Sequence, residues 1–108
     1  MKEILLLAGA LLAFSHFAFA EQPETPAVTP EQIKRGSAHY AQHCAACHGP
    51  RMKDPEGSFD LRKFPLDQYD RFVRSVTHGK GAMPPWGGLL KPDDVEALWA
   101  YVVAGEKN

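Results

Sequence analysis

The sequence is short of several features that would each mark a class of protein. It has two cysteines in 108 residues, and its formal net charge is −1, from 12 lysines and arginines against 13 aspartates and glutamates. A balance so near neutral points away from nucleic acid and from a charged membrane surface as partners. Two cysteines cannot supply the disulfide framework that stabilises many small secreted domains. The length allows one small domain at most, and no internal repeat is visible.

Long apolar runs are missing as well, apart from one near the first residue. The run Ile4–Phe14 is too short to span a bilayer. Lys2 precedes it, and the small residues of Ala18–Ala20 follow at the place of a cleavage site. This pattern predicts a secretory signal peptide at residues 1–20, with an uncleaved anchor as the alternative. We therefore expect an exported, periplasmic protein with no stable membrane span.

The segment Cys44-Ala45-Ala46-Cys47-His48 is the most informative part of the chain. Two cysteines separated by two residues and followed by histidine are the signal for attachment of c-type haem. Thiols about one helical turn apart can form thioether bonds to the two vinyl groups of one haem. The histidine that follows then lies under the porphyrin, where its imidazole can bind the iron. We expect Cys44 and Cys47 to hold the haem, and His48 to be the proximal iron ligand.

Two other interpretations of the cysteine pair are weaker. A redox-active disulfide of the thioredoxin kind would need strand–helix–strand patterning nearby, which this chain lacks. A zinc site would need more ligands, and neither a second cysteine pair nor a histidine at finger-like spacing is present, although His39 and His43 lie close by.

The remaining chain predicts helices joined by loops rich in glycine and proline. Residues 21–28 indicate a flexible, proline-rich leader, and residues 29–108 the domain proper. The first helix begins at Glu31, runs through His43 into the haem motif and ends past His48, at Gly49-Pro50. A capping threonine and a proline precede it, and its glycine predicts close approach of another helix. A second helix opens at 65–67 and ends at Gly79, and a third covers 92–104; both carry an apolar stripe at helical spacing. We expect an all-α fold.

These features resemble the class I cytochromes c, small electron carriers with one haem. The likeness covers the chain from Thr29 onward and includes Gly36 and Tyr40 on the first helix and Leu98 and Tyr101 on the last. It implies three main helices and their loops wrapped around one covalently attached haem c. It also implies that Met83 is the second axial ligand of the iron.

Other residues compete with Met83 or with its proposed role. A core methionine filling a gap is one alternative, and His78 is a rival sixth ligand that would lower the reduction potential. A proline flank and the lack of a helical stripe favour Met83. Trp86 either lies near a haem propionate or packs in its loop, and the basic residues of the loops, Arg62, Lys63 and Lys80, either border the haem opening or face solvent.

The chain departs from the family in the loop after the haem motif. The family has a proline there, and the proline carbonyl accepts a hydrogen bond from the proximal imidazole. This chain has Ser58-Phe59-Asp60-Leu61 at that place, which leaves the accepting carbonyl open, with Pro55 as an outside candidate. Leu61 matches the haem-packing leucine that follows in the family. Because this bond sets the basicity of the imidazole, it bears on the reduction potential.

The resemblance implies a periplasmic one-electron carrier rather than an enzyme. It would act as a monomer that passes electrons from a dehydrogenase or respiratory complex to a terminal oxidase or reductase, through transient contacts. The alternative is a haem enzyme or a gas sensor, which would need an open or labile sixth position on the iron.

Overall fold

The computed structural model describes residues 27–106, and α-helices form most of that range. They are α1 (Pro30–His43), α2 (Ala45–His48), α3 (Tyr69–His78) and α4 (Pro92–Ala104), with 3-10 turns at Pro50–Met52 and Leu61–Lys63. The described range contains no strand, only an isolated antiparallel bridge between Lys80 and Met83. The prediction of an all-α fold is confirmed. The predicted signal peptide, residues 1–20, and most of the predicted leader lie outside the described residues.

The α1 helix begins where the sequence places its cap. Thr29 accepts a hydrogen bond from the backbone N–H of Gln32 at 3.2 Å, and the Gln32 side chain accepts one from the Thr29 N–H at 3.1 Å. Pro30 occupies the first turn, where a missing N–H costs nothing. This reciprocal capping box fixes the direction in which α1 leaves the preceding chain.

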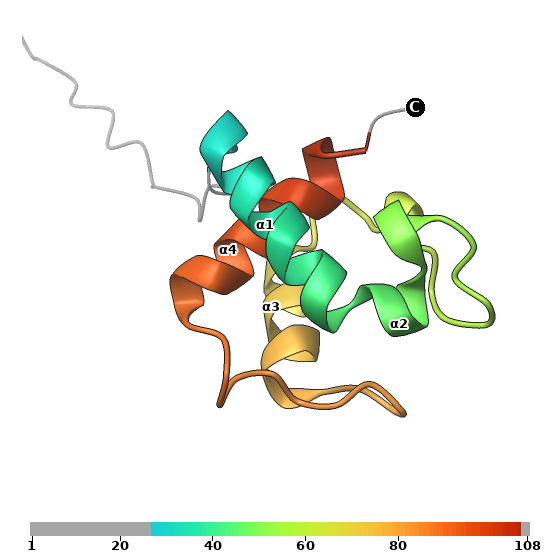
Figure 1. Ribbon diagram of the computed structural model, residues 1–108. Coiled ribbons are helices and arrows are strands. Elements are labelled where there is room, and N and C mark those ends of the chain that lie inside the picture. Colours follow the sequence, from blue (N-terminus) through green and yellow to red (C-terminus); the bar gives the residue numbers. More distant parts are fainter. Residues whose placement is uncertain (1–26, 107–108) are drawn as a thin grey trace, which may run out of the picture.

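The helices α1 and α4 cross at close range, and Figure 1 shows α1 lying over α4. A Cβ atom added to Gly36 would collide with the carbonyl oxygen of Ala97 and would lie 2.9 Å from the Cβ of Tyr101. The predicted reason for this glycine is therefore confirmed. Beside the crossing, the rings of Tyr40 and Tyr101 lie 5.1 Å apart, and both side chains are almost fully buried.

The helix α3 begins later than predicted. Pro65 opens a separate turn, in which the Gln68 N–H donates to the Pro65 carbonyl, and the helix starts at Tyr69. Its predicted apolar stripe is confirmed, because Phe72 and Val76 are buried. Gly79 ends α3 with a φ of 80°, in the region that favours glycine.

An aromatic cluster fills the space between α3 and α4. The ring of Trp99 lies 5.2–5.9 Å from the rings of Phe64, Tyr69 and Phe72, in tilted or edge-on arrangements. Such arrangements suit the charge distribution of aromatic rings. Trp99 is 1% exposed and belongs to the core. None of the helices described is long and apolar enough to span a membrane.

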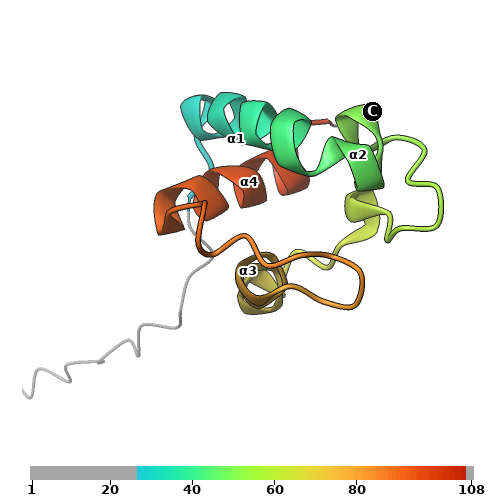
Figure 2. The same cartoon turned by 60° about the horizontal axis from the view of Figure 1, so that its bottom comes forward.

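The helix α2 and the segment between α3 and α4 lie at the same end of the molecule. Figure 2 shows α2 facing that segment, residues 79–91, with α4 to their left between α1 and α3. The fold thus brings the predicted haem motif and the predicted methionine to one end, although Met83 follows His48 by 35 positions in the sequence.

Candidate functional site

The haem motif lies at the junction of α1 and α2. Cys44 caps the C-terminal end of α1, and its carbonyl accepts hydrogen bonds from the N–H groups of Cys47 at 3.2 Å and His48 at 2.9 Å. These bonds place the two cysteines about one helical turn apart, as attachment of both to one haem requires. The sequence predicts a single helix through the motif, but the structure divides it at Cys44 into α1 and α2. Gly49, with a φ of 87°, then ends α2 at the predicted position.

The two cysteines are free thiols in different surroundings. Cys44 is half-buried against the hydrophobic core, whereas Cys47 is exposed. Burial, and to a lesser extent the neighbouring Cys47, raises the pKa of the Cys44 thiol to about 11. A redox-active Cys-x-x-Cys pair has a lowered pKa instead, because the thiolate is its nucleophile. The thioredoxin-like alternative is therefore disfavoured by the electrostatics of the site.

His48, the predicted proximal ligand, is oriented by a backbone carbonyl. The Nδ1 atom of His48 lies 3.0 Å from the carbonyl oxygen of Phe59. A carbonyl oxygen only accepts, so Nδ1 carries the proton and donates it. The lone pair of Nε2 is then free for a metal, and the hydrogen bond increases the basicity of the ring.

This carbonyl resolves the departure from the family pattern in the sequence. Phe59 accepts the bond that a proline accepts in the family, and the outside candidate Pro55 was wrong. Phe59 is 49% exposed, and its ring packs edge-on against the ring of Phe64, with centroids 6.0 Å apart. Leu61, two residues later, packs against the hydrophobic core; its match to the haem-packing leucine of the family stays a prediction.

Met83 lies in a segment that folds back on itself. Its N–H donates to the Lys80 carbonyl at 3.0 Å, and its carbonyl accepts from the Lys80 N–H at 3.1 Å. A Cβ on Gly79 would lie 2.7 Å from the Met83 carbonyl oxygen, so this glycine permits the turn. The Met83 side chain is half-buried and packs against the same hydrophobic core as Cys44.

The rival ligands have other surroundings. His78 is exposed at the end of α3. His39 places Nε2 3.1 Å from a carboxylate oxygen of Asp94 and so joins α1 to α4. His43 lies with its ring 5.0 Å from the ring of Trp86, which is half-buried against the core. Within residues 27–106, no group of three or more histidine, cysteine and acidic side chains is arranged to hold a metal ion, so the zinc interpretation gains no support.

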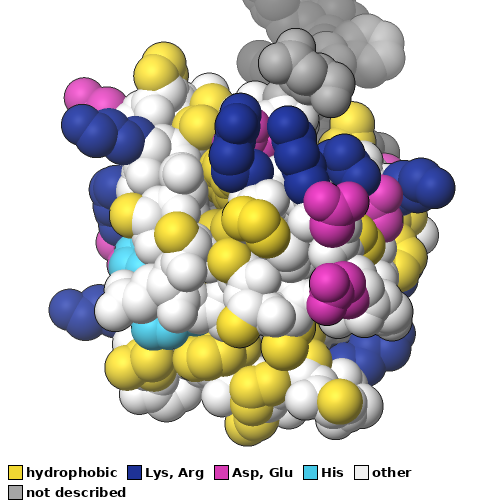
Figure 3. Space-filling model, turned by 45° about the vertical axis from the view of Figure 1, so that its right-hand side comes forward, with side chains coloured by type: hydrophobic (Ala, Val, Ile, Leu, Met, Phe, Trp, Pro, Cys, Tyr) yellow, Lys and Arg dark blue, Asp and Glu magenta, His cyan; other side chains and the backbone are white. Residues whose placement is uncertain are grey.

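The chemistry of the donor set suits haem c. Two free thiols a turn apart, an imidazole with its Nε2 lone pair available and a half-buried thioether belong to one end of the fold. The segments beside them are uncharged at several exposed positions, namely Ala46, Ala82, Pro84 and Pro85. Figure 3 shows hydrophobic and histidine side chains along the lower part of one face, while charged side chains gather above them.

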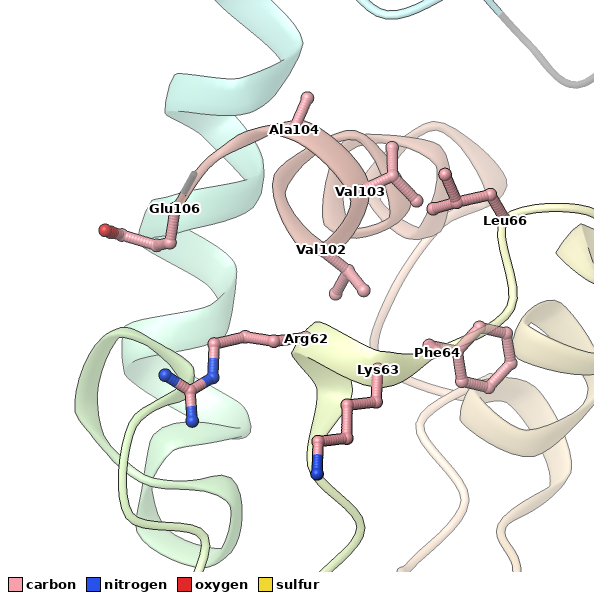
Figure 4. Close-up of a pocket in the computed structure, with 8 residues that line it drawn as sticks. All are labelled: Arg62, Lys63, Phe64, Leu66, Val102, Val103, Ala104 and Glu106. Carbon is pink, nitrogen blue, oxygen red and sulfur yellow. The ribbon is translucent and has the colours of Figure 1, made fainter. Parts of the chain in front are cut away.

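A surface hollow elsewhere in the molecule is separate from this site. It measures about 590 Å³ and lies between the 3-10 turn at Leu61–Lys63 and the end of α4. Figure 4 shows its apolar side chains on α4 and the segment 64–66, with Arg62 and Lys63 below them. None of Cys44, Cys47, His48 and Met83 lines it. Arg62, which also pairs with Asp60 at 3.1 Å, and Lys63 thus border this hollow.

The chain is similar in sequence to a protein family and to several known proteins. Residues 31–102 match the family model described as cytochrome c oxidase, cbb3-type, subunit III. Cytochrome c6 of Nostoc sp. (strain PCC 7120) is 32% identical, over 95% of this chain and 93% of that protein. Cytochrome c6 of Microcystis aeruginosa is 36% identical, over 64% of this chain and 91% of that protein.

A solved structure agrees with the sequence comparisons. Cytochrome c6 of the diatom Phaeodactylum tricornutum matches with a TM-score of 0.51 and 28% identity, over 65% of this chain and 88% of that chain. The match covers the fold and most of the length of the solved protein. The family model, the relatives and the solved structure therefore agree with the helical fold of this chain.

Proposed function

The chain belongs to the class I cytochrome c family and is a small electron carrier with covalently bound haem c, and on that premise we propose its ligands and its place of action. Cys44 and Cys47 form the two thioether bonds, and His48 and Met83 are the axial ligands of the iron. The protein is exported and shuttles single electrons in the periplasm. Bound haem supplies the redox centre, which stores one electron at iron.

One observation carries this proposal. The hydrogen bond from His48 Nδ1 to the Phe59 carbonyl leaves Nε2 as the free nitrogen of an imidazole that follows the cysteine pair directly. A metal-bound histidine typically donates its other ring nitrogen in this way, to a carbonyl or a carboxylate. The bond therefore supports His48 as the proximal ligand better than the motif does alone.

The surroundings of the two candidate distal ligands favour Met83. Its side chain is half-buried against the core that also contacts Cys44, whereas His78 is exposed. A buried thioether costs little to desolvate because it is a neutral, weakly polar group. A methionine opposite histidine raises the reduction potential, and the electron-donating effect of the Phe59 hydrogen bond on His48 opposes this rise.

The arrangement suits electron transfer rather than chemistry on a substrate. With both axial positions filled by His48 and Met83, no small molecule binds the iron without displacing a ligand. The neighbouring apolar core excludes water, which limits solvent rearrangement when the charge on the iron changes. Contacts with partners are transient, and the partners are a dehydrogenase or respiratory complex as donor and an oxidase or reductase as acceptor.

Carbon monoxide binding to the reduced protein tests this proposal. We expect a reversible one-electron redox titration and no carbon monoxide adduct in the wild type, because Met83 fills the sixth position. Met83→Ala should bind carbon monoxide readily, while His78→Ala should behave as the wild type. Rapid formation of the adduct in the wild type would instead support the haem enzyme or gas sensor.

A further inference from the structure

The segment that carries Met83 is held to α3 by main-chain hydrogen bonds. The Trp86 N–H donates to the Val76 carbonyl at 2.8 Å, and the Gly87 N–H donates to the Thr77 carbonyl at 3.1 Å. The bridge between Lys80 and Met83 closes the turn between these points. These bonds involve backbone atoms, so they are available whatever side chain residue 86 carries. They attach the segment to α3, but they do not connect it to the haem motif.

A side-chain contact connects the segment to the haem motif. The ring of Trp86, three residues after Met83, lies 5.0 Å from the ring of His43 at an interplanar angle of 46°. His43 is the last residue of α1 and directly precedes Cys44. Both side chains are half-buried. The contact therefore joins the chain on the thioether side of the site to the chain that carries the distal donor.

His43 is itself held in place on α1. It stands one helical turn after His39, and the two imidazole rings are stacked with centroids 6.4 Å apart and an interplanar angle of 17°. His39 is anchored to α4 through Asp94. Trp86 in turn packs against the hydrophobic core. Each side chain of the pair is therefore packed against other parts of the fold. An aromatic contact between two such side chains restrains the segments that carry them.

We propose that His43 and Trp86 form a clasp that holds the Met83 segment closed, so that both are positioning residues for the methionine–iron bond. This inference rests on Met83 being the axial ligand. A methionine thioether is a neutral donor that a stronger nitrogen ligand can replace once the segment opens. The clasp acts on the opening step, so its loss increases the fraction of molecules in which the iron is open to an added ligand.

Imidazole binding to the ferric protein measures that fraction. We expect His43→Ala and Trp86→Ala each to raise the apparent affinity for imidazole about three- to tenfold, the range expected for losing one aromatic contact. Trp86→Phe keeps a ring at this position and should stay near the wild type. The double variant should exceed neither single variant by much, because both remove the same contact. Leu89→Ala, an exposed apolar residue of the same segment, is the matched control and should leave the affinity unchanged.

The outcomes separate the clasp from the ligand assignment. The sulfur-to-iron charge-transfer band of the wild type reports Met83 on the iron, and its absence would overturn both. With the band present, imidazole affinities equal to the wild type in His43→Ala and Trp86→Ala would overturn the clasp alone. Fully additive effects in the double variant would also overturn the clasp. A Trp86→Phe protein with the imidazole affinity of Trp86→Ala would do the same, because the indole N–H, and not the ring contact, would then hold the segment. Thermal unfolding of His43→Ala and Trp86→Ala, compared with Trp86→Phe, identifies any general loss of stability.

Discussion

The helix crossing at Gly36 gives the sharpest prediction about stability. In Gly36→Ala, the new Cβ would overlap the Ala97 carbonyl, with the carbonyl carbon at 2.5 Å and the Tyr101 Cβ at 2.9 Å. Overpacking costs about 1–3 kcal/mol, and we take the upper end because backbone atoms cannot rotate away. Alanine returns about 1 kcal/mol of helix propensity. The net expectation is a loss of about 2 kcal/mol.

Thermal unfolding of the haem-loaded protein measures this loss. For a domain of this size, about 2 kcal/mol corresponds to a melting temperature lower by about 8–16 °C. Gly88→Ala is the matched control, because a Cβ at Gly88 meets no atom within 4 Å. It should be neutral or slightly stabilising, since alanine restricts the unfolded chain. If both variants melt alike, the crossing does not require a glycine and the reasoning is refuted.

Two further predictions concern polar contacts near the same helices. Tyr40→Phe should lower the free energy of unfolding by about 1–3 kcal/mol, because the Tyr40 hydroxyl donates at 2.6 Å to the buried Gly49 carbonyl, which would lose its partner. Tyr69 is a half-buried tyrosine whose hydroxyl makes no hydrogen bond in the described range, so Tyr69→Phe should cost much less in the same thermal unfolding experiment. The Arg51 guanidinium holds the pKa of Glu106 below its usual range, so the ion pair stabilises the fold above the ordinary glutamate pKa of about 4.3 and loses that contribution as the pH falls below it. Glu106→Gln should therefore flatten the acid side of the stability curve, and an unchanged slope would count against this pair.

Local sequence signals predicted the helices well. The bounds of α4 and the capping box of α1 agree with the sequence because caps and apolar periodicity depend on residues within one or two turns. The start of α3 was wrong by several residues, because Pro65 begins a turn of its own before the helix. Proline suits both a turn and a first helical position, so the sequence alone did not distinguish them.

The surroundings of the site were harder to predict. The hydrogen bond from His48 ends on a backbone carbonyl, and every residue has one, so the sequence pattern does not identify Phe59. Met52 gives another example: it lies in a stretch predicted as loop, has a φ of 59°, and is 1% exposed in the core. The His43–Trp86 contact joins residues distant in sequence, and only the folded arrangement brings them together.

The near-infrared absorption spectrum of the ferric protein tests the central claim most directly. The protein should be purified from a host that matures c-type haem, together with Met83→Ala and His78→Ala. We predict a weak sulfur-to-iron charge-transfer band in the wild type and in His78→Ala, and its loss in Met83→Ala. A wild type without the band, or a band that persists in Met83→Ala, would contradict the assignment of Met83 as the axial ligand of this electron carrier.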